Sequence, residues 1–180
     1  NHYFIGQVVN ELRSIYLGAP YEYKIEYNFR NVTDKIYQDG RLRFFCNVPK
    51  WMEFLNDSDL TFGSRLHGNI AAVLAGTPAL LVTKDSRTRE LAEYHHLNAI
   101  HESKLNEKLT LQDLVEQQDF TQIEKYQKQN LDRYVAFLKK NDIPNIFMDG
   151  EDPQETAFDR KIKQTDLLEG IVPVSQCSLE

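Results

Sequence analysis

The segment with the clearest chemical potential is residues 63–68, which read Gly-Ser-Arg-Leu-His-Gly. Arg65 carries a planar guanidinium that matches the oxygens of a carboxylate or a phosphate. His67 carries an imidazole, which can give or take a proton near neutral pH. Gly68 has no Cβ and allows a ligand to approach the backbone closely. These residue types predict an anion site that also holds a proton donor.

The elements expected around this segment support the same chemistry. Residues 60–62 form a brief apolar segment, and a helix of small residues is expected over 69–75. A helix start offers unpaired N–H groups and a positive dipole end. In an open parallel sheet, such a junction lies at the carboxyl edge of the strands, where ligands usually bind. The structural alternative is that Arg65 pairs with a structural carboxylate and that His67 is satisfied by the backbone.

A second charged cluster, formed by Asp85, Arg87 and Arg89, opens the next expected helix. The two arginines could contact phosphates of a nucleotide- or lipid-linked ligand. The alternative is a solvated helix face on which Asp85 pairs with Arg89 at the i,i+4 spacing. Asp85 is also a good N-cap residue, which is a sufficient structural reason for its presence.

The order of apolar segments predicts an α/β fold with a parallel sheet. Residues 79–83 read as a strand buried on both faces, and a helix is expected from Asp85 or Ser86 to about residue 96. A shorter strand is expected over 42–46, followed by a helix that Pro49 opens.

Helices are also expected at both ends of this central region. Apolar spacing predicts a helix over residues 5–17. Thr110 and Thr121 each begin a pattern that resembles a capping box, and the second helix is expected to reach about Lys140. Residues 21–27 alternate like a strand.

Composition and charge limit the classes of function. The chain has 180 residues, 41% of them hydrophobic, which is enough for a packed core. Its net charge of −6 is concentrated in residues 142–180, so residues 1–141 are balanced. We therefore expect a Rossmann-like domain over 1–141 and an acidic, loosely packed tail over 142–180. A balanced body without a basic patch argues against a nucleic-acid partner.

Membrane and metal chemistry are not indicated either. The longest apolar run is too short for a membrane span. The histidines 95, 96 and 101 lack a shared helical face and a carboxylate at ligand spacing, so we expect neither a metal nor a resident cofactor. Cys46 lies in an apolar run and is expected to be buried.

Three stretches, 51–55, 61–82 and 85–94, together resemble the polysaccharide pyruvyltransferase family. The combination of Ser-Arg-Leu-His-Gly at 64–68 with Ala-Gly-Thr-Pro at 75–78 is its most specific part. The resemblance covers roughly residues 40–97, about a third of the chain.

The resemblance implies a Rossmann-like parallel sheet flanked by helices, like the C-terminal domain of a GT-B-type fold. It implies a transferase that moves the pyruvyl group of phosphoenolpyruvate onto a sugar as a ketal. The acceptor would be a nucleotide- or lipid-linked precursor of a bacterial cell-surface exopolysaccharide, handled in the cytoplasm. Arg65 and His67 would be catalytic, and the substrate would contact Ser64, Arg65, Leu66, His67, Gly68, Asp85 and Arg87.

Such an enzyme places its pocket between two domains, so we expect this chain to be the C-terminal half. A missing N-terminal domain would complete the site, and the chain alone would be inactive. An absent first strand would leave a sheet edge open to self-association into a homo-oligomer. The alternatives are a glycosyltransferase of the same architecture that uses a nucleotide sugar, and a member of the family that binds ligands without catalysis.

Overall fold

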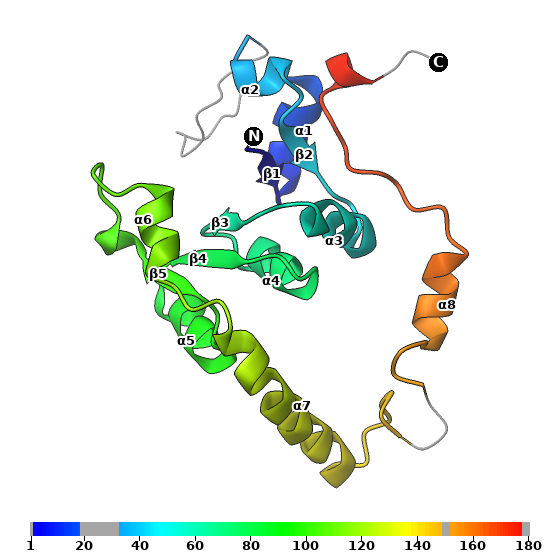
Figure 1. Ribbon diagram of the computed structural model, residues 1–180. Coiled ribbons are helices and arrows are strands. Elements are labelled where there is room, and N and C mark those ends of the chain that lie inside the picture. Colours follow the sequence, from blue (N-terminus) through cyan, green and yellow to red (C-terminus); the bar gives the residue numbers. More distant parts are fainter. Residues whose placement is uncertain (1, 19–32, 149–151, 178–180) are drawn as a thin grey trace. The chain divides into compact units, whose positions relative to one another are not determined.

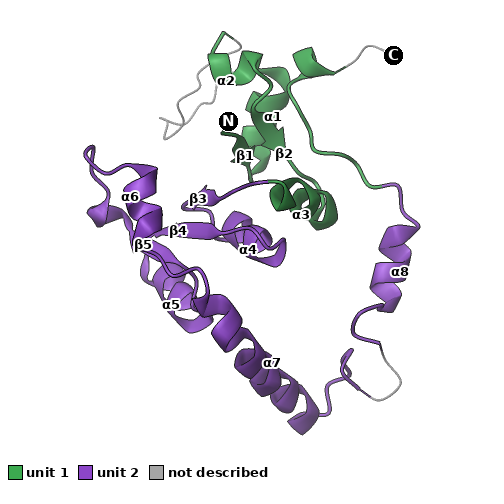
Figure 2. Ribbon diagram, viewed as in Figure 1, with its two compact units in different colours: residues 1–57, 167–180 green, residues 58–166 purple. Residues whose placement is uncertain are grey.

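The computed structural model describes residues 2–18, 33–148 and 152–177. The chain divides into two compact units: unit 1 comprises residues 1–57 and 167–180, and unit 2 comprises residues 58–166 (Figure 2). Each unit contains parallel strands with helices packed against them, which confirms the predicted α/β class and its Rossmann-like arrangement (Figure 1). The strand-like pattern at 21–27 lies outside the described residues.

Unit 1 is built around a parallel pair of strands. Its elements are, in chain order, β1 (Phe4–Gly6), α1 (Val9–Leu17), α2 (Lys35–Gln38), β2 (Leu42–Phe44), α3 (Val48–Asn56) and the 3-10 helix η2 (Val174–Gln176). β1 pairs with β2 from Phe4 opposite Leu42 to Gly6 opposite Phe44. Ile15, Tyr37 and Leu42 form its buried core.

The helix predicted over residues 5–17 is partly wrong, because residues 4–6 form a strand. Their pairing with β2 is a long-range interaction that local apolar spacing does not reveal. Helix α1 buries Glu11, Ser14 and Ile15. The Glu11 carboxylate accepts the backbone N–H of Gln7 at 2.6 Å and so caps the helix start.

The end of the described chain packs into unit 1. Ile171 and Phe44 exchange two backbone hydrogen bonds, of 2.7 and 3.0 Å. The Asn47 side chain, which also caps α3, donates to the carbonyl of Leu168 at 2.8 Å. These contacts hold part of the segment 142–180, which was expected to be a loosely packed tail. The domain boundary between residues 141 and 142 stays a prediction. Cys46 is exposed, so its expected burial is wrong.

Unit 2 holds the clearest part of the fold. Its elements are, in chain order, β3 (Thr61–Gly63), α4 (Leu66–Leu74), β4 (Ala79–Thr83), α5 (Ser86–His95), β5 (Ala99–His101), the 3-10 helix η1 (Glu102–Lys104), α6 (Leu111–Glu116), α7 (Gln122–Lys140) and α8 (Ala157–Lys163). The strands are parallel in the order β3-β4-β5. All five residues of the central strand β4 are buried, as its unbroken apolar run predicts.

Helix α4 lies close to the sheet because its inward residues are small. Ala71 and Ala72 are almost fully buried beside β3 and β4. Gly76 ends this segment in the left-handed region at φ 83°, and the N–H of Thr77 returns to the carbonyl of Ala72 at 2.9 Å. This tight turn leads directly into β4.

The connection between β3 and α4 is fixed by one buried amide. The Asn69 side chain, 5% exposed, donates to the carbonyl of Gly63 at 3.1 Å and to that of Arg65 at 2.9 Å. Its oxygen accepts the hydroxyl of Thr61 at 3.3 Å. Asn69 therefore ties the end of the strand to the start of the helix across the loop.

The helices after the sheet are confirmed only in part. The capping box at Thr110 is present, whereas the hydroxyl of Thr121 bonds to Asp119 and does not cap α7. Helix α7 ends at Lys140 as predicted. Strand β5 and helix α8 were not predicted, because both elements are short.

Replacing Asn69 by alanine should lower the free energy of unfolding by about 1–3 kcal/mol, because the carbonyls of Gly63 and Arg65 and the hydroxyl of Thr61 each lose a hydrogen bond to the buried amide. Urea unfolding of the two proteins measures this difference. Asn106 is exposed, and its side chain accepts a hydrogen bond from the N–H of Lys108 at 3.0 Å, which water can replace. Asn106→Ala therefore serves as control and should change the free energy by about 0.5 kcal/mol or less. An equally small effect of Asn69→Ala would show that the amide does not hold the connection.

Acid should destabilise the chain through carboxylates at helix starts. Hydrogen bonds from Thr88 lower the pKa of Asp85, and hydrogen bonds from Thr110 lower the pKa of Asp113. A depressed folded-state pKa adds stability above the unfolded-state pKa, near 4, and that stability is lost as the pH falls through the folded-state pKa.

Asp85→Asn should therefore flatten the fall in thermal stability between about pH 5 and pH 2, since asparagine can still cap the helix. The measurement is the melting temperature as a function of pH. Asp132→Asn on α7 is the matched control and should leave the slope unchanged. Equal slopes for all three proteins would contradict the role given to Asp85.

Candidate functional site

Arg65 and His67 lie at the junction between β3 and α4. Helix α4 begins at Leu66, three residues earlier than expected, so Arg65 is its N-cap residue and His67 lies in its first turn. The Arg65 backbone is extended, and both side chains are exposed. The guanidinium of Arg65 and the imidazole of His67 thus lie two residues apart at the exposed start of α4.

The early helix start also brings backbone donors to this junction. The first intrahelical N–H bond is donated by Asn69 to Arg65. The N–H groups of Leu66, His67 and Gly68 therefore belong to the first turn, where an α-helix supplies no carbonyl partner. Ser64 is half-buried just before them. Together with the positive dipole end, this turn can bind one anionic group.

Asp85 and Arg87 lie at the next junction, between β4 and α5. The Asp85 carboxylate caps α5 by accepting the backbone N–H of Thr88 at 2.7 Å and its hydroxyl at 2.8 Å. These bonds, with a smaller contribution from the charge of Arg87, lower the pKa of Asp85 and keep it ionised. The expected pair between Asp85 and Arg89 is not made, because the Arg89 side chain lies 3.9 Å from Glu93.

Parallel pairing places both junctions at one edge of the sheet. Gly63 is opposite Leu81, so the first junction leaves the sheet beside the carboxyl end of β4, from which the second one follows. The exposed cations Arg65 and Arg87 thus belong to neighbouring loops at the same edge. This arrangement fits a ligand with more than one negative charge, since each loop can bind a different group.

The structure also forms a cavity that the sequence did not indicate. Its volume is about 440 Å³, and it lies in unit 2 along β5. Arg89 of the second charged cluster lines it, whereas residues 64–68, Asp85 and Arg87 do not. Asn98 lies in its wall, and the buried side-chain nitrogen of Asn98 has no hydrogen-bond partner among the described residues. Asn98 directly precedes β5, a strand that was not predicted, so the sequence did not single it out.

Asn69 is another residue whose role was missed. The sequence marks it only as a small residue near a helix start, yet it lies one turn before Ala72 on the buried face of α4. A polar residue at a core position of an apolar helix must find hydrogen-bond partners, and that spacing is the signal that identifies it.

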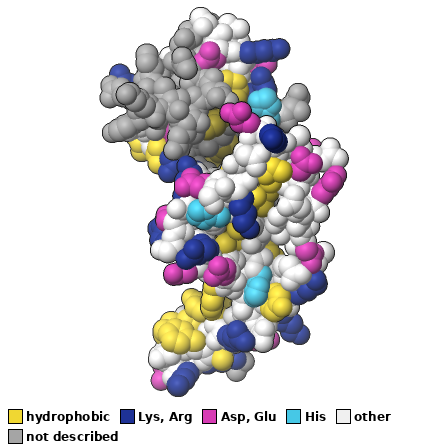
Figure 3. Space-filling model, turned by 90° about the vertical axis from the view of Figure 1, so that its left-hand side faces the viewer, with side chains coloured by type: hydrophobic (Ala, Val, Ile, Leu, Met, Phe, Trp, Pro, Cys, Tyr) yellow, Lys and Arg dark blue, Asp and Glu magenta, His cyan; other side chains and the backbone are white. Residues whose placement is uncertain are grey.

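The described residues were also compared with the requirements of metal sites, membrane spans and charged surfaces. Among the described residues, no group of three His, Cys, Asp or Glu side chains could hold a metal ion. None of the described helices is long and apolar enough to cross a membrane. Lys, Arg, Asp and Glu side chains are interspersed over the described surface shown in Figure 3. The expectation that the chain needs no cofactor stays a prediction.

Comparison with known proteins locates a family likeness over part of the chain. The family model described as polysaccharide pyruvyl transferase matches residues 15–86, less than half of the chain. Comparison with curated proteins and with solved structures gives no match. The matched segment includes the whole of residues 64–68 together with Asp85 and ends just before Arg87. The resemblance expected from the sequence is therefore confirmed: residues 15–86 of this chain are similar to the polysaccharide pyruvyl transferase family.

Proposed function

We propose that this chain carries the phosphoenolpyruvate-binding part of a polysaccharide pyruvyl transferase. The observation that carries the proposal is the family match over residues 15–86, which includes both Ser64–Gly68 and Asp85. The geometry supports it, because parallel pairing brings these two loops to one edge of a sheet. The acceptor would be a nucleotide- or lipid-linked sugar precursor of a cell-surface polysaccharide.

Phosphoenolpyruvate, the proposed pyruvyl donor, carries two anionic groups, a carboxylate and a phosphate. Arg65 binds one of them through its guanidinium, in the bidentate geometry that a carboxylate or phosphate accepts. The backbone N–H groups of the first turn of α4, including that of Gly68, bind the other. Arg87, exposed on the neighbouring loop, adds positive charge at the same edge. Asp85 fixes that loop by capping α5.

His67 supplies the proton for the reaction. Protonation of the terminal enol carbon turns the adjacent carbon into an oxocarbenium-like centre, which a sugar hydroxyl attacks. The bond between this carbon and the phosphate oxygen then breaks, and inorganic phosphate leaves. A second hydroxyl of the same sugar attacks in its place, and the two hydroxyl protons pass to solvent or base. The product is a cyclic ketal.

The exposure of Arg65 and His67 suggests that a second body completes the site. Both side chains face solvent in this chain. Transfer to a sugar rather than to water requires that bulk water be excluded from the reacting centre. We propose that another domain of the full enzyme covers this edge and supplies the remaining groups.

The 180-residue chain should bind phosphoenolpyruvate weakly, and Arg65→Ala should reduce the affinity at least about tenfold, because one charge-assisted contact is lost. Calorimetric titration measures both. Arg133 lies on the exposed face of α7, so Arg133→Ala is the matched control and should bind like the unaltered chain.

The same titration separates the alternatives. Inorganic phosphate should bind more weakly than phosphoenolpyruvate, since it lacks the carboxylate. Tighter binding of a uridine diphosphate sugar would replace the proposal with a nucleotide-sugar glycosyltransferase. Unchanged binding of phosphoenolpyruvate by Arg65→Ala would place the donor elsewhere.

The chain by itself should release no phosphate from phosphoenolpyruvate above the rate in buffer, even with glucose or galactose as acceptor, because its site stays open to water. A coupled phosphate assay tests this. Phosphate release that is lost in both Arg65→Ala and His67→Gln would show that the chain is active without a second domain.

A further inference from the structure

One side of helix α7 carries large apolar side chains that the rest of the described chain leaves uncovered. Leu131, Tyr134 and Phe137 are 41%, 58% and 55% exposed. Their spacing of three residues places them within about a third of the helix circumference, and we call this side the apolar face of α7. The segment that follows the helix adds three more exposed apolar side chains, at Ile143, Ile146 and Met148. Large apolar side chains that are exposed together mark a surface that another body covers.

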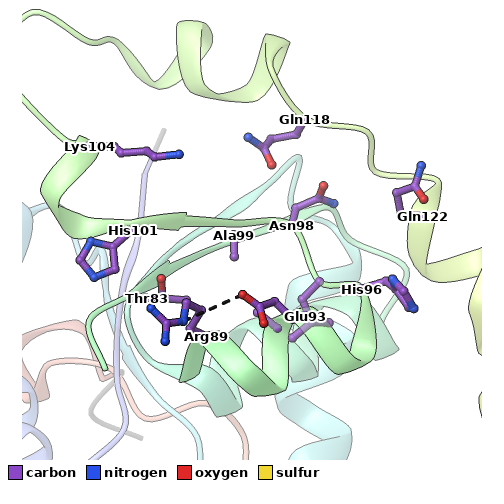
Figure 4. Close-up of a pocket in the computed structure, with 12 residues that line it drawn as sticks. Thr83, Arg89, Glu93, His96, Asn98, Ala99, His101, Lys104, Gln118 and Gln122 are labelled. Carbon is purple, nitrogen blue, oxygen red and sulfur yellow. Dashed lines mark ion pairs between the residues drawn. The ribbon is translucent and has the colours of Figure 1, made fainter. Parts of the chain in front are cut away.

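Among the described residues, α7 is held mainly at its start. In Figure 4 the His96 side chain points from the end of α5 toward the side where α7 begins, and its ring stacks on Tyr126 with centroids 3.7 Å apart. Over residues 127–137 only Asn130 and Val135 are half-buried, and every other residue is exposed. A helix in a protein gains most of its stability by packing its apolar face, so this stretch needs a surface to pack on.

Positive charges border the apolar face on both sides. With about 100° between successive residues, Lys128 and Lys139 lie on one flank of the face. Arg133 and Lys140 lie on the other flank, and Asp132 lies on the opposite side of the helix. Helix α7 holds five Lys or Arg residues and two Asp or Glu residues, whereas the whole chain has a net charge of −6. An anionic surface is therefore attracted to this helix more than to the rest of the chain.

We propose that the apolar face of α7 docks on a lipid bilayer with anionic headgroups. A helix lies in the plane of a bilayer surface when its apolar side chains enter the acyl boundary and its flanking Lys and Arg side chains reach the headgroups. Tyr134 is a residue type that favours the level of the headgroups. None of the described helices is apolar and long enough to cross a bilayer, so α7 lies on its surface.

The same charges disfavour a second copy of the chain as the body that covers this face. In an antiparallel pair of α7 helices, each flank would meet the same flank of the other copy. In a parallel pair, the flank of Lys128 and Lys139 would meet the flank of Arg133 and Lys140. Cations would face cations in either orientation, which opposes association. Anionic headgroups interact favourably with both flanks at once.

Docking on a bilayer also bears on the acceptor, in a step that rests on the proposed function. The acceptor of that reaction would be a nucleotide-linked or a lipid-linked sugar. A chain held at a bilayer surface meets substrates that are anchored in the bilayer, so the inference favours the lipid-linked precursor. The docking itself does not require phosphoenolpyruvate and can be measured without it.

The test is cosedimentation of the 180-residue chain with vesicles made of equal parts of phosphatidylglycerol and phosphatidylcholine. The chain should bind these vesicles, and it should bind vesicles of phosphatidylcholine alone at least about tenfold more weakly. The double variant Tyr134→Ala with Phe137→Ala should weaken binding at least about tenfold, because two rings that enter the bilayer are lost. Lys139→Gln with Lys140→Gln should weaken it by a similar factor.

Matched double variants change the same residue types outside α7. Tyr94→Ala with Phe158→Ala removes two exposed rings, and Lys104→Gln with Lys108→Gln removes two exposed cations. Both should leave the affinity for the anionic vesicles within about twofold. The substituted side chains are all exposed, so circular dichroism should show the same helix content in every variant.

Absence of binding to both kinds of vesicle would overturn the proposal, as would binding that neither double variant of α7 weakens. Equal binding to both kinds of vesicle would refute the anionic requirement. A dimer in the absence of lipid that Tyr134→Ala with Phe137→Ala dissociates would show instead that a second copy covers the face. Vesicle binding by a chain that does not bind phosphoenolpyruvate would support the docking and count against the proposed function alone.

Discussion

The hydrogen bonds of one buried amide hold together the part of the fold on which the candidate donor site depends. Asn69 binds the carbonyls of Gly63 and Arg65 with the two hydrogens of a single nitrogen, and its oxygen accepts the hydroxyl of Thr61. These hydrogen bonds fix both ends of the loop, at Gly63, the last residue of β3, and at Arg65, the N-cap residue of α4. The amide donates to two backbone carbonyls and makes no bond to the N–H groups of the first turn, to which we assign the binding of an anion.

The sheet adds a second constraint, which is direction. Since β3, β4 and β5 are all parallel, every loop that follows them leaves at the same edge. Because its inward residues are small, α4 packs closely against the fully buried strand β4. Packing in the core therefore determines where the start of α4 lies. In this way an apolar strand and an alanine-rich helix position the exposed residues Arg65 and Arg87. The cavity along β5 arises differently, from the packing of α5 and of the segment before α7.

Local patterns in the sequence were sufficient to predict the middle of the fold. The unbroken apolar run of β4 and the capping signal at Asp85 give strong local preferences that the structure keeps. Predictions were wrong where contacts between residues far apart in the sequence determine the secondary structure or the burial of a side chain. Strand β1 forms by pairing with β2. Glu11 is buried because its carboxylate accepts backbone N–H groups at the start of α1. The junction at 63–68 could be identified from residue types, whereas the cavity around Asn98 depends on tertiary packing that no local pattern encodes.

We propose that the loop of residues 64–68 and the loop of residues 84–87 act together on one anionic substrate, phosphoenolpyruvate. Amide nuclear magnetic resonance of the chain during titration with phosphoenolpyruvate tests it most directly. We expect saturable shifts of the Leu66, His67 and Gly68 amides together with those of the second loop, at one common affinity. Shifts confined to residues 96–104, or none in either loop at saturating ligand, would contradict it.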